Sequence, residues 1–205
     1  MDLDALPPNH HARHPPFRGV RGLLAALSMT VGRSGDATVA RSLAGMGIGD
    51  RVVDVGCGPG VAVRAASAAG ASAVVGVDPS AVMRRVARLL GVPPGATYAD
   101  GVAEALPVED GWATVVWSIA TAHHWGDVDA GLAEAGRVLQ PAGRVVVLER
   151  RVRPGATGLA SHGWTDAQAA AFAERCMACG FTDVVVGEHD TGRRGPALAV
   201  VGTRR

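Results

Sequence analysis

The chain has 205 residues, 48% of them hydrophobic and 19% charged, a length that predicts one domain with at most a short appendage. Twenty basic residues face nineteen acidic ones, giving a net charge of +1, and this balance argues against a nucleic-acid partner, whose phosphates favour a basic excess. Every basic residue is an arginine, so catalysis through a Schiff-base lysine is excluded.

The cysteines and the first residues of the sequence indicate the cellular compartment. Three cysteines do not suggest a disulfide framework, and a reducing cytoplasm is the simplest compartment. Residues 1–16 are acidic and then rich in His and Pro, without the apolar segment of a signal peptide. No apolar run approaches the roughly 18 residues of a membrane span. We therefore expect a cytoplasmic protein with no membrane partner.

The first 46 residues differ in pattern from the rest of the chain. Residues 1–18 contain paired prolines, which remove backbone donors and fix φ, so an irregular segment is expected. In residues 19–46, apolar side chains recur at spacings of three and four, which predicts amphipathic helices interrupted near 32–36. We predict an N-terminal tail with cap helices at 1–46 and a main domain at 47–205.

From residue 51 onward, short apolar runs alternate with helical patterns. Ser80 and Thr165 fit the N-cap positions of two of the predicted helices. The last two strands lack an intervening helix and are expected to pair antiparallel at one edge. The pattern indicates an α/β fold with a Rossmann-like, doubly wound, mostly parallel seven-stranded sheet. Strands are predicted at 51–55, 73–77, 96–99, 113–118, 144–149, 182–188 and 197–203, and helices at 61–69, 80–90, 127–139 and 165–179.

A glycine-rich loop, DVGCGPG (54–60), follows the first predicted strand. Its glycines let the backbone turn sharply and approach a ligand, and the N-terminus of the next helix offers free N–H groups. Open α/β sheets bind ligands at this position. Taken alone, the loop is also compatible with a tight strand–helix turn that binds nothing.

Carboxylates end three successive predicted strands, namely Asp54, Asp78 and Asp100. From its position Asp78 can accept hydrogen bonds from both hydroxyls of a ribose. Structural explanations remain for two of them, because an acid stabilises a helix N-terminus and aspartates form turns. Since the carboxyl ends of parallel strands share one edge of a sheet, we expect the three acids to converge on one cleft.

The spacing of the glycines separates two classes of cofactor. A dinucleotide fingerprint reads G-x-G-x-x-G, whose third glycine would fall at Val61. The observed spacing is G-x-G-x-G, and Asp54 beside it would repel a pyrophosphate while suiting a ligand with an ammonium group. A nicotinamide-dependent oxidoreductase is therefore the weaker alternative.

The chain resembles the class I S-adenosylmethionine-dependent methyltransferases, above all the branch of ubiquinone- and menaquinone-biosynthesis methyltransferases and small-molecule enzymes. The family's Phe-Asp before the fourth strand is replaced by Ala113-Thr114, and its Pro-Gly-Gly turn by PAG (141–143). SIAT (118–121) occupies the place of the signature of adenine and glutamine amino-group enzymes, which lowers the case for such acceptors. The resemblance covers about residues 50–150 through VVDVGCGPG (52–60), VVGVDPSAVM (74–83), YADGVAEALP (98–107), TAHHW (121–125) and RVLQPAGRVVVLE (137–149).

By this resemblance the cofactor is S-adenosyl-L-methionine, with S-adenosyl-L-homocysteine as product. Asp54 and the loop at 56–60 would hold the methionyl part, and Asp78 would bind the ribose. Met83 would pack near the adenine, and the adenine edge and the sulfonium side would be lined by segments 100–102 and 118–119. The implied cofactor-binding residues are Asp54, Gly56, Cys57, Gly58, Gly60, Asp78, Pro79, Met83, Asp100, Gly101, Val102, Ser118 and Ile119.

Methyl transfer from a sulfonium is an in-line displacement in which the protein mainly positions the acceptor, so a general base is not strictly required. If a base acts, histidine is the expected type because its pKa lies near neutrality. His123 and His124 follow the fourth predicted strand, and His162 lies in the connection after the fifth. These three are the candidate catalytic residues, as bases or as groups that position the acceptor. Hydrogen bonding to the backbone, packing with Trp125 and a plain surface loop are the structural alternatives.

The N-terminal run HHARHPPF (10–17) contains His10, His11 and His14. It is a candidate for part of a lid over the acceptor site, with a solvated tail as the alternative. A metal site from H-H-x-x-H is a weak interpretation, because real sites need three or four ligands in fixed geometry, and no metal is predicted. Either Arg18 or Arg33 is a candidate to neutralise the cofactor carboxylate.

Several other residues admit both a functional and a structural interpretation. Trp125 and Trp164 are candidates to line an apolar acceptor pocket. The arginines in segment 150–153 fit contact with an acidic acceptor or a solvated face. Cys176 and Cys179 form a single C-x-x-C pair, which is interpreted as incidental or part of the core, since one pair makes no zinc site.

Together these observations predict a methyltransferase that acts on a small-molecule acceptor, as a monomer or homodimer. A protein that binds S-adenosylmethionine without transferring its methyl group is the first alternative, ahead of the nicotinamide-dependent oxidoreductase. The acceptor is expected to be determined by residues 1–46 and 150–164, which carry no recognisable motif.

Overall fold

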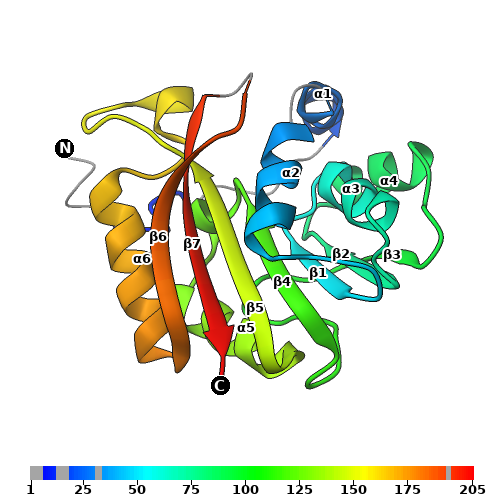
Figure 1. The fold of residues 1–205 in the computed structure, drawn as a ribbon. Coiled ribbons are helices and arrows are strands. Elements are labelled where there is room, and N and C mark those ends of the chain that lie inside the picture. Colours follow the sequence, from blue (N-terminus) through cyan, green and yellow to red (C-terminus); the bar gives the residue numbers. More distant parts are fainter. Residues whose placement is uncertain (1–6, 13–18, 31–33, 193–194) are drawn as a thin grey trace.

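The computed structural model describes residues 7–12, 19–30, 34–192 and 195–205. Its centre is a seven-stranded sheet in the order β3-β2-β1-β4-β5-β7-β6 (Figure 1). Strands β1 to β5 pair in parallel, and β7 pairs antiparallel with both β5 and β6. This arrangement confirms the predicted mostly parallel sheet with an antiparallel C-terminal pair. The strands are β1 (Arg51–Val55), β2 (Ala73–Val77), β3 (Ala96–Ala99), β4 (Ala113–Ile119), β5 (Leu139–Arg150), β6 (Phe181–Asp190) and β7 (Pro196–Arg204).

Helices cover both faces of the sheet. One hydrophobic cluster joins the sheet to α5 and α6, and a second joins the opposite face to α2 and α3. The valines of β1 show why the strand has apolar side chains on both faces: Val53 and Val55 belong to the first cluster and Val52 to the second. The helices are α1 (Gly19–Met29), α2 (Ser34–Leu43), α3 (Val61–Ala68), α4 (Ala81–Leu89), α5 (Val128–Val138) and α6 (Asp166–Ala178), with short 3₁₀ helices η2 (Ala122–His124) and η3 (Gly158–Ser161).

Two helix starts follow the predicted capping residues. The Ser80 side chain accepts a hydrogen bond from the Met83 amide at 3.3 Å, at the start of α4. Thr165 and Gln168 form a reciprocal capping box at the start of α6. Because each cap satisfies amides that the first helical turn leaves without a partner, both helices begin where the sequence predicts.

Strand β5 differs from its prediction, which covered only 144–149. It begins at Leu139, which pairs with Ala113 before the register shifts between Ala113 and Val115. The shift accommodates the turn at 141–143, where Ala142 adopts a positive φ of 62°. A register shift leaves no periodic pattern in the sequence, so the start of β5 was not predicted. The helix predicted up to residue 139 ends at Val138 in the structure.

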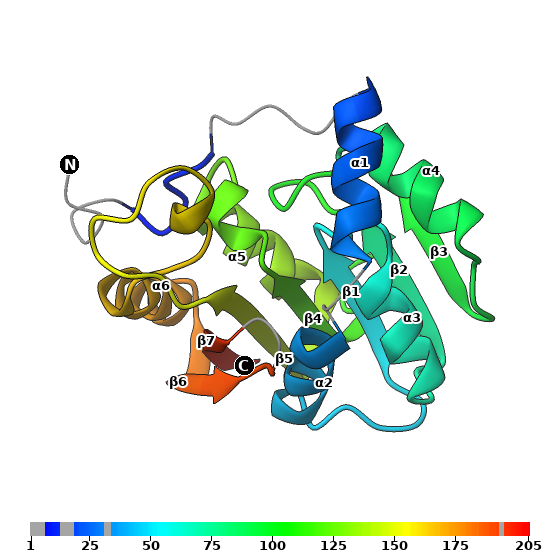
Figure 2. The ribbon, with the colours of Figure 1, turned by 90° about the horizontal axis from the view of Figure 1, so that it is seen from above.

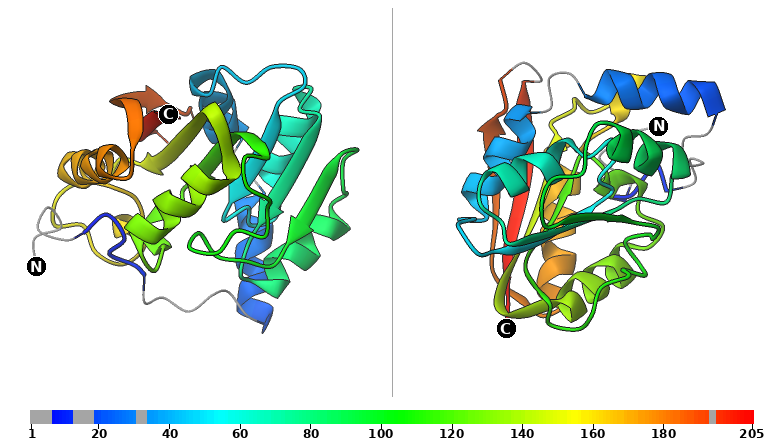
Figure 3. Two further views of the ribbon diagram at one scale, coloured as in Figure 1. Left: turned by 90° about the horizontal axis from the view of Figure 1, so that it is seen from below. Right: turned by 90° about the vertical axis from the view of Figure 1, so that its right-hand side faces the viewer.

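The two N-terminal helices pack on different parts of the main fold. Figures 2 and 3 show α1 crossing the end of the molecule next to α4, and Ala26 of α1 packs against Met83 and Val86 of α4. Helix α2 packs on α3 and on the strands β4 and β5. Two helices separated near residue 32 agree with the predicted pattern, while the division into cap and main domain stays a prediction. Among the described residues, no helix combines the length and the apolar character needed to cross a bilayer.

Candidate active site

The glycine loop connects β1 to α3 and packs tightly at two of its positions. Gly56 and Gly60 have φ values of 76° and 79°, in the region that side-chain-bearing residues rarely adopt. A Cβ atom at Gly56 would lie 2.5 Å from the Thr121 hydroxyl oxygen, and one at Gly60 would lie 2.3 Å from the Tyr98 hydroxyl oxygen. The loop is therefore clamped between the end of β4 and β3, and both positions require glycine.

Asp78, at the end of β2, is held by backbone amides. Its carboxylate accepts hydrogen bonds from the Gly58 and Ser80 amides, each at 2.8 Å, and the residue is 8% exposed. Burial raises the pKa of Asp78, and these two hydrogen bonds oppose the rise without cancelling it. Asp54 lies at the neighbouring end of β1 and is 2% exposed, so two buried carboxylates border the glycine loop as the sequence predicts.

Asp100 has different surroundings from these two acids. Its carboxylate is 73% exposed and forms an ion pair at 2.8 Å with Arg84 of α4. Arg84 also donates to the carbonyl oxygen of Asp78, so one arginine links the ends of β2 and β3. Met83 is buried beneath α1, whereas Val102 is exposed. The predicted adenine-binding residues thus lie at one edge of the sheet, with roles that stay predictions.

A small pocket opens beside the loop. Cap helix α2 contributes Ala37 to its wall, opposite the end of β4. Burial, followed by the negative charges of Asp54 and Asp78, raises the pKa of the Cys57 thiol well above its usual range, so this thiol stays protonated and is no nucleophile. The lining residues are Ala37, Asp54, Gly56, Cys57, Pro59, Val61, Ala62 and Ile119.

Thr121 ties the end of β4 to the end of β1. Its hydroxyl donates to the Val55 carbonyl at 2.9 Å and contacts the Ser118 hydroxyl at 2.7 Å. The chain turns sharply here, with Ala120 at a φ of 56°. Sequence reasoning assigned no role to Thr121, because a contact between two strand ends leaves no local pattern. These contacts bring segment 118–119, which is predicted to line the sulfonium side of the cofactor, against the glycine loop.

Beyond Thr121, His123 forms a buried pair with Glu149 of β5. The His123 Nδ1 atom lies 2.8 Å from a Glu149 carboxylate oxygen, and the His123 amide donates to the other oxygen at 3.3 Å. Glu149 has no exposed surface and His123 is 2% exposed. Burial by itself raises the pKa of Glu149, but the His123 ring outweighs it and the pKa of this carboxyl is lowered. Glu149 is a site residue that the sequence analysis missed, although it is the second-to-last residue of a valine-rich strand, as Asp54 is in β1.

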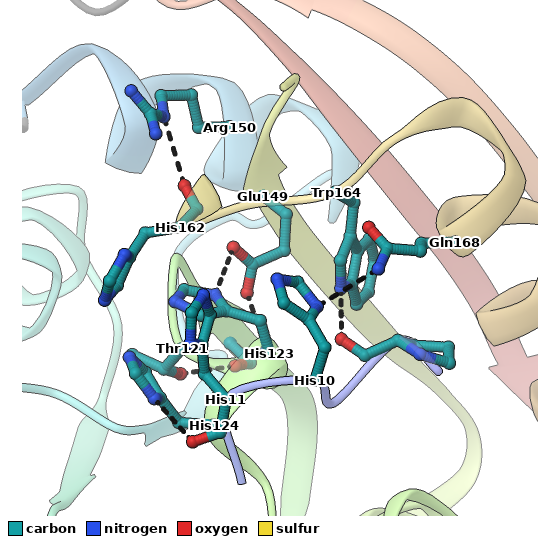
Figure 4. A network of polar contacts seen from close by, with 12 residues as sticks. His10, His11, Thr121, His123, His124, Glu149, Arg150, His162, Trp164 and Gln168 are labelled. Carbon is teal, nitrogen blue, oxygen red and sulfur yellow. Dashed lines mark hydrogen bonds and ion pairs between the residues drawn. The ribbon is translucent and has the colours of Figure 1, made fainter. Parts of the chain in front are cut away.

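The structure brings all three candidate catalytic histidines together, although they come from two distant segments (Figure 4). One ring nitrogen from each of His123, His124 and His162 lies within 4.8 Å of the other two. The His124 Nδ1 atom lies 3.3 Å from the His11 carbonyl, and the His162 Nδ1 atom lies 3.2 Å from the Gly158 carbonyl. Burial, and then the neighbouring His123, lowers the pKa of His124 to about 3, so this ring is neutral at physiological pH.

Residues 7–12 are held against these histidines. The His11 amide donates to the His123 carbonyl at 2.9 Å, and ring nitrogens of His10 and His11 contact the carbonyl and hydroxyl oxygens of Ser161 at 3.0 and 3.1 Å. The Trp164 indole donates to the Pro8 carbonyl at 2.8 Å. These contacts place the segment beside the three histidines, and its role as a lid stays a prediction. The other residues named with it, His14, Phe17, Arg18 and Arg33, lie outside the described residues.

The structure also shows the surroundings of three further sets of residues, namely the tryptophans, the arginines of segment 150–153 and the cysteines. Trp125 and Trp164 pack in the core, with ring centroids 5.9 and 4.7 Å from that of Phe172, so they do not line an open acceptor pocket. Arg150 donates to backbone carbonyls of segment 159–162, and Arg151 forms ion pairs with two acids. All three cysteines are free thiols, as predicted. Both tryptophans contact Phe172 of α6. The local sequence around each tryptophan does not indicate this contact, because α6 is a separate element.

Comparison with known protein families gives a match to the part of the chain that contains the glycine loop. Residues 53–147 match a family model described as a methyltransferase domain. This segment is similar to a methyltransferase domain. It contains the glycine loop, both buried carboxylates and the first two histidines of the cluster.

Curated relatives match parts of the same segment. An uncharacterised protein of Escherichia coli, YafE, is 45% identical over 53 residues, which is 26% of each protein. A chloroplastic tocopherol O-methyltransferase of Arabidopsis thaliana is 32% identical over 102 residues, covering 48% of this chain and 29% of that protein. The chain spans only about a quarter to a third of the length of its curated relatives.

Solved structures resemble nearly the whole chain. An S-adenosylmethionine-dependent methyltransferase from Aquifex aeolicus superposes with a TM-score of 0.71 at 16% identity, covering 89% of this chain and 98% of that one. One from Mesorhizobium loti gives 0.66 at 24%, covering 83% and 98%. The [4+2]-cyclase SpnF gives 0.67 at 17%, covering 96% and 86%. At these identities the shared feature is the Rossmann-like methyltransferase fold.

Proposed function

We propose that the chain binds S-adenosylmethionine at the glycine loop and transfers its methyl group to a small-molecule acceptor by in-line displacement. One observation carries the proposal: the buried carboxylates Asp54 and Asp78 flank a loop of left-handed glycines within a methyltransferase domain. The donor set suits this cofactor, whose methionyl part carries an ammonium group and whose ribose carries two hydroxyls.

The residues around the loop fit that cofactor in two respects. Each oxygen of the Asp78 carboxylate accepts one amide hydrogen and keeps lone-pair capacity for a ribose hydroxyl. At Gly58, an added Cβ atom would meet no heavy atom of the described residues within 4 Å, so a ligand can approach the backbone there. A charged neighbour such as Asp54 favours an ammonium group and opposes a pyrophosphate.

The bound cofactor supplies the electrophilic methyl group, and the chain's own residues position the acceptor. The histidines His123, His124 and His162 lie just beyond the end of β4, next to the predicted sulfonium side. The Glu149 carboxylate accepts a hydrogen bond from Nδ1–H of His123 and so presents the other ring nitrogen of His123 to the cluster. We assign these three histidines to acceptor positioning or proton removal.

A small-molecule acceptor is supported by the relatives and by the charge of the chain. Tocopherol O-methyltransferase, by its name, methylates an organic hydroxyl, which makes a hydroxyl-bearing acceptor the first class to test. The near-neutral net charge gives no electrostatic support for nucleic acid. A cytoplasmic monomer or homodimer stays part of the proposal.

A second function is favoured by one finding. The cyclase SpnF shares the fold, and one fold hosts different reactions, so binding of the cofactor without methyl transfer is the alternative. It predicts the same affinity for S-adenosylmethionine but no transfer to any acceptor.

Calorimetric titration of the chain with S-adenosylmethionine, S-adenosylhomocysteine and NAD tests the cofactor assignment. We expect micromolar binding of the two sulfur nucleosides, at least about tenfold weaker binding in Asp54→Ala and Asp78→Ala, and no binding of NAD. Asp110→Ala is the matched control, because Asp110 is an exposed aspartate paired with Arg137. Binding of NAD, or wild-type affinity in both loop variants, contradicts the proposal.

Transfer is tested separately with labelled methyl groups and a panel of phenols, alcohols, amines and thiols. Release of S-adenosylhomocysteine together with a methylated product supports the methyltransferase. Tight cofactor binding with no product across the panel favours the alternative.

A further inference from the structure

The histidine cluster is defined as His123, His124 and His162. The hydrogen bonds of its three rings determine which ring nitrogens carry a lone pair, and methyl transfer alone does not require this arrangement. In each ring the Nδ1 atom lies within hydrogen-bond distance of an oxygen that carries no proton to donate: a Glu149 carboxylate, the His11 carbonyl and the Gly158 carbonyl. Each Nδ1 atom therefore carries the proton, and in a neutral ring the lone pair then lies on Nε2. Three such lone pairs at close range favour a bound cation.

The Nε2 atom of His123 points to the same conclusion. It is fully buried, in a side chain that is only 3% exposed, and it has no hydrogen-bond partner among the described residues. A buried ring nitrogen without a partner is costly, whether it carries a lone pair or a proton. A metal ion at this position supplies the missing partner.

We infer that His123, His124 and His162 bind one divalent transition-metal ion, of which Zn²⁺ is the best match, through one ring nitrogen each. Imidazole nitrogens suit zinc, and three protein ligands with an open fourth position are typical of a reactive zinc site. In a tetrahedral site with Zn–N bonds of about 2.1 Å, ligand atoms lie roughly 3.4 Å apart. The ring nitrogens lie within 4.8 Å of one another, so small ring rotations bring them around an ion.

Surrounding contacts hold the three rings in place. Glu149 orients His123 in the carboxylate–histidine arrangement that accompanies metal-bound histidines. Arg150 donates to the carbonyls of His162, Leu159 and Ala160 and so fixes the loop that carries His162. The hydrogen bond between the His11 amide and the His123 carbonyl adds a third segment of chain to the same site (Figure 4).

The use of the metal rests on the proposed methyltransferase function. The open position would take the hydroxyl oxygen of an acceptor, and coordination lowers the pKa of that hydroxyl. Its proton leaves to solvent, the oxygen attacks the methyl carbon of the sulfonium, and the electrons of the broken C–S bond return to sulfur. The products are a methyl ether and S-adenosylhomocysteine.

Metal binding is tested without any enzyme assay, on the full chain free of any histidine tag and stripped with a chelator. We expect one equivalent of Zn²⁺ in a competition titration against a chromophoric chelator, and a tetrahedral visible spectrum with Co²⁺. Glu149→Gln should weaken zinc binding about 10- to 100-fold, the effect typical of a lost outer-shell carboxylate. His162→Ala and His124→Ala should weaken it further, because each removes a ligand.

Two controls keep the outcome unambiguous. His189→Ala changes a histidine on β6, away from the cluster, and should bind zinc as the wild type does. His162 lies on a partly exposed loop, so its variant should fold, which circular dichroism checks. Absence of stoichiometric binding in the wild type, or full affinity in His162→Ala with loss in His14→Ala, overturns the inference.

The readout is independent of the proposed function. S-adenosylhomocysteine binding in His162→Ala should match the wild type, since the glycine loop is unchanged. Failure of zinc binding with normal nucleoside binding rejects the metal site alone. Failure of nucleoside binding with normal zinc binding rejects the proposed function alone.

Discussion

At the scale of single residues, Asp78 shows how burial and charge set a binding site. Its carboxylate is nearly enclosed, yet two backbone amides hold it at the end of β2. A carboxylate that stays ionised there is a strong acceptor for neutral hydroxyls, because charge-assisted hydrogen bonds exceed neutral ones. The same burial makes the site sensitive to acid.

The pH dependence of cofactor affinity follows from this residue. Burial raises the pKa of Asp78 above the value of 3.8 usual for aspartate, so protonation removes the ribose acceptor at a higher pH than it would at the surface. We expect the Kd for S-adenosylhomocysteine to be constant near neutrality and to rise as the pH falls through the raised pKa. Calorimetry over a pH series measures it.

Asp78→Asn is the control for this titration. Asparagine carries no titrating group, so the variant should bind more weakly near neutrality and lose the part of the pH dependence that is due to Asp78. Linkage gives the opposite sign for the folding of the free protein: because the folded-state pKa is raised, the contribution of Asp78 to stability falls as the pH rises through that pKa. Identical pH profiles in the two proteins would contradict the assignment.

At the scale of elements, the capping box of α6 fixes one end of the loop that carries His162. The Thr165 hydroxyl accepts from the Gln168 amide at 3.3 Å, and the Gln168 side chain accepts from the Thr165 amide at 3.0 Å. Both residues are about 1% exposed. The helix therefore starts at a defined residue, and the preceding chain is directed toward the histidine cluster.

Thr165→Ala should lower the free energy of unfolding by about 1–2 kcal/mol, because it removes the cap and leaves buried amides without a partner. Chemical denaturation measures the change. Thr157→Ala is the matched control: Thr157 is exposed and precedes η3 without a capping hydrogen bond, so its effect should stay within about 0.5 kcal/mol. Equal losses in both variants would show that the capping box has no special weight.

At the scale of the whole molecule, the site is assembled from segments that are far apart in the chain. Residues 7–12, η2, the end of β5 and the loop before α6 meet around the histidine cluster. The Trp164 indole anchors the first of these segments through the Pro8 carbonyl. Loss of this hydrogen bond should therefore increase the mobility of residues 7–12.

Trp164→Phe keeps an aromatic ring in the core and removes this hydrogen bond. We expect amide hydrogen exchange in residues 7–12 to accelerate, because the segment loses a buried tether worth about 1 kcal/mol. Trp117→Phe is the matched control, since the Trp117 indole is buried and has no hydrogen-bond partner in the part of the chain that the structure describes. Unchanged exchange at residues 7–12 in Trp164→Phe would rule out the tether.

Much of the fold could be predicted from local signals. Apolar strands, helical periodicity and capping residues locate the elements, because each pattern reflects which faces must be buried and which backbone amides must be satisfied. The extra length of β5 was missed, because the register shift after Ala113 is set by the neighbouring strand. The position of the glycine loop and its acids follows from a general property of parallel sheets, whose carboxyl ends share one edge.

By itself, then, the sequence determined the sheet, the glycine loop and the pair of carboxylates beside it, since local strand and helix patterns locate the elements and parallel strands place their carboxyl ends at one edge. Only the tertiary structure decided that Glu149 orients His123, that His162 joins it, and that Trp125 and Trp164 pack in the core. These contacts join residues across different strands and loops. Their energies depend on burial and on distances between segments, which no local pattern of residues encodes.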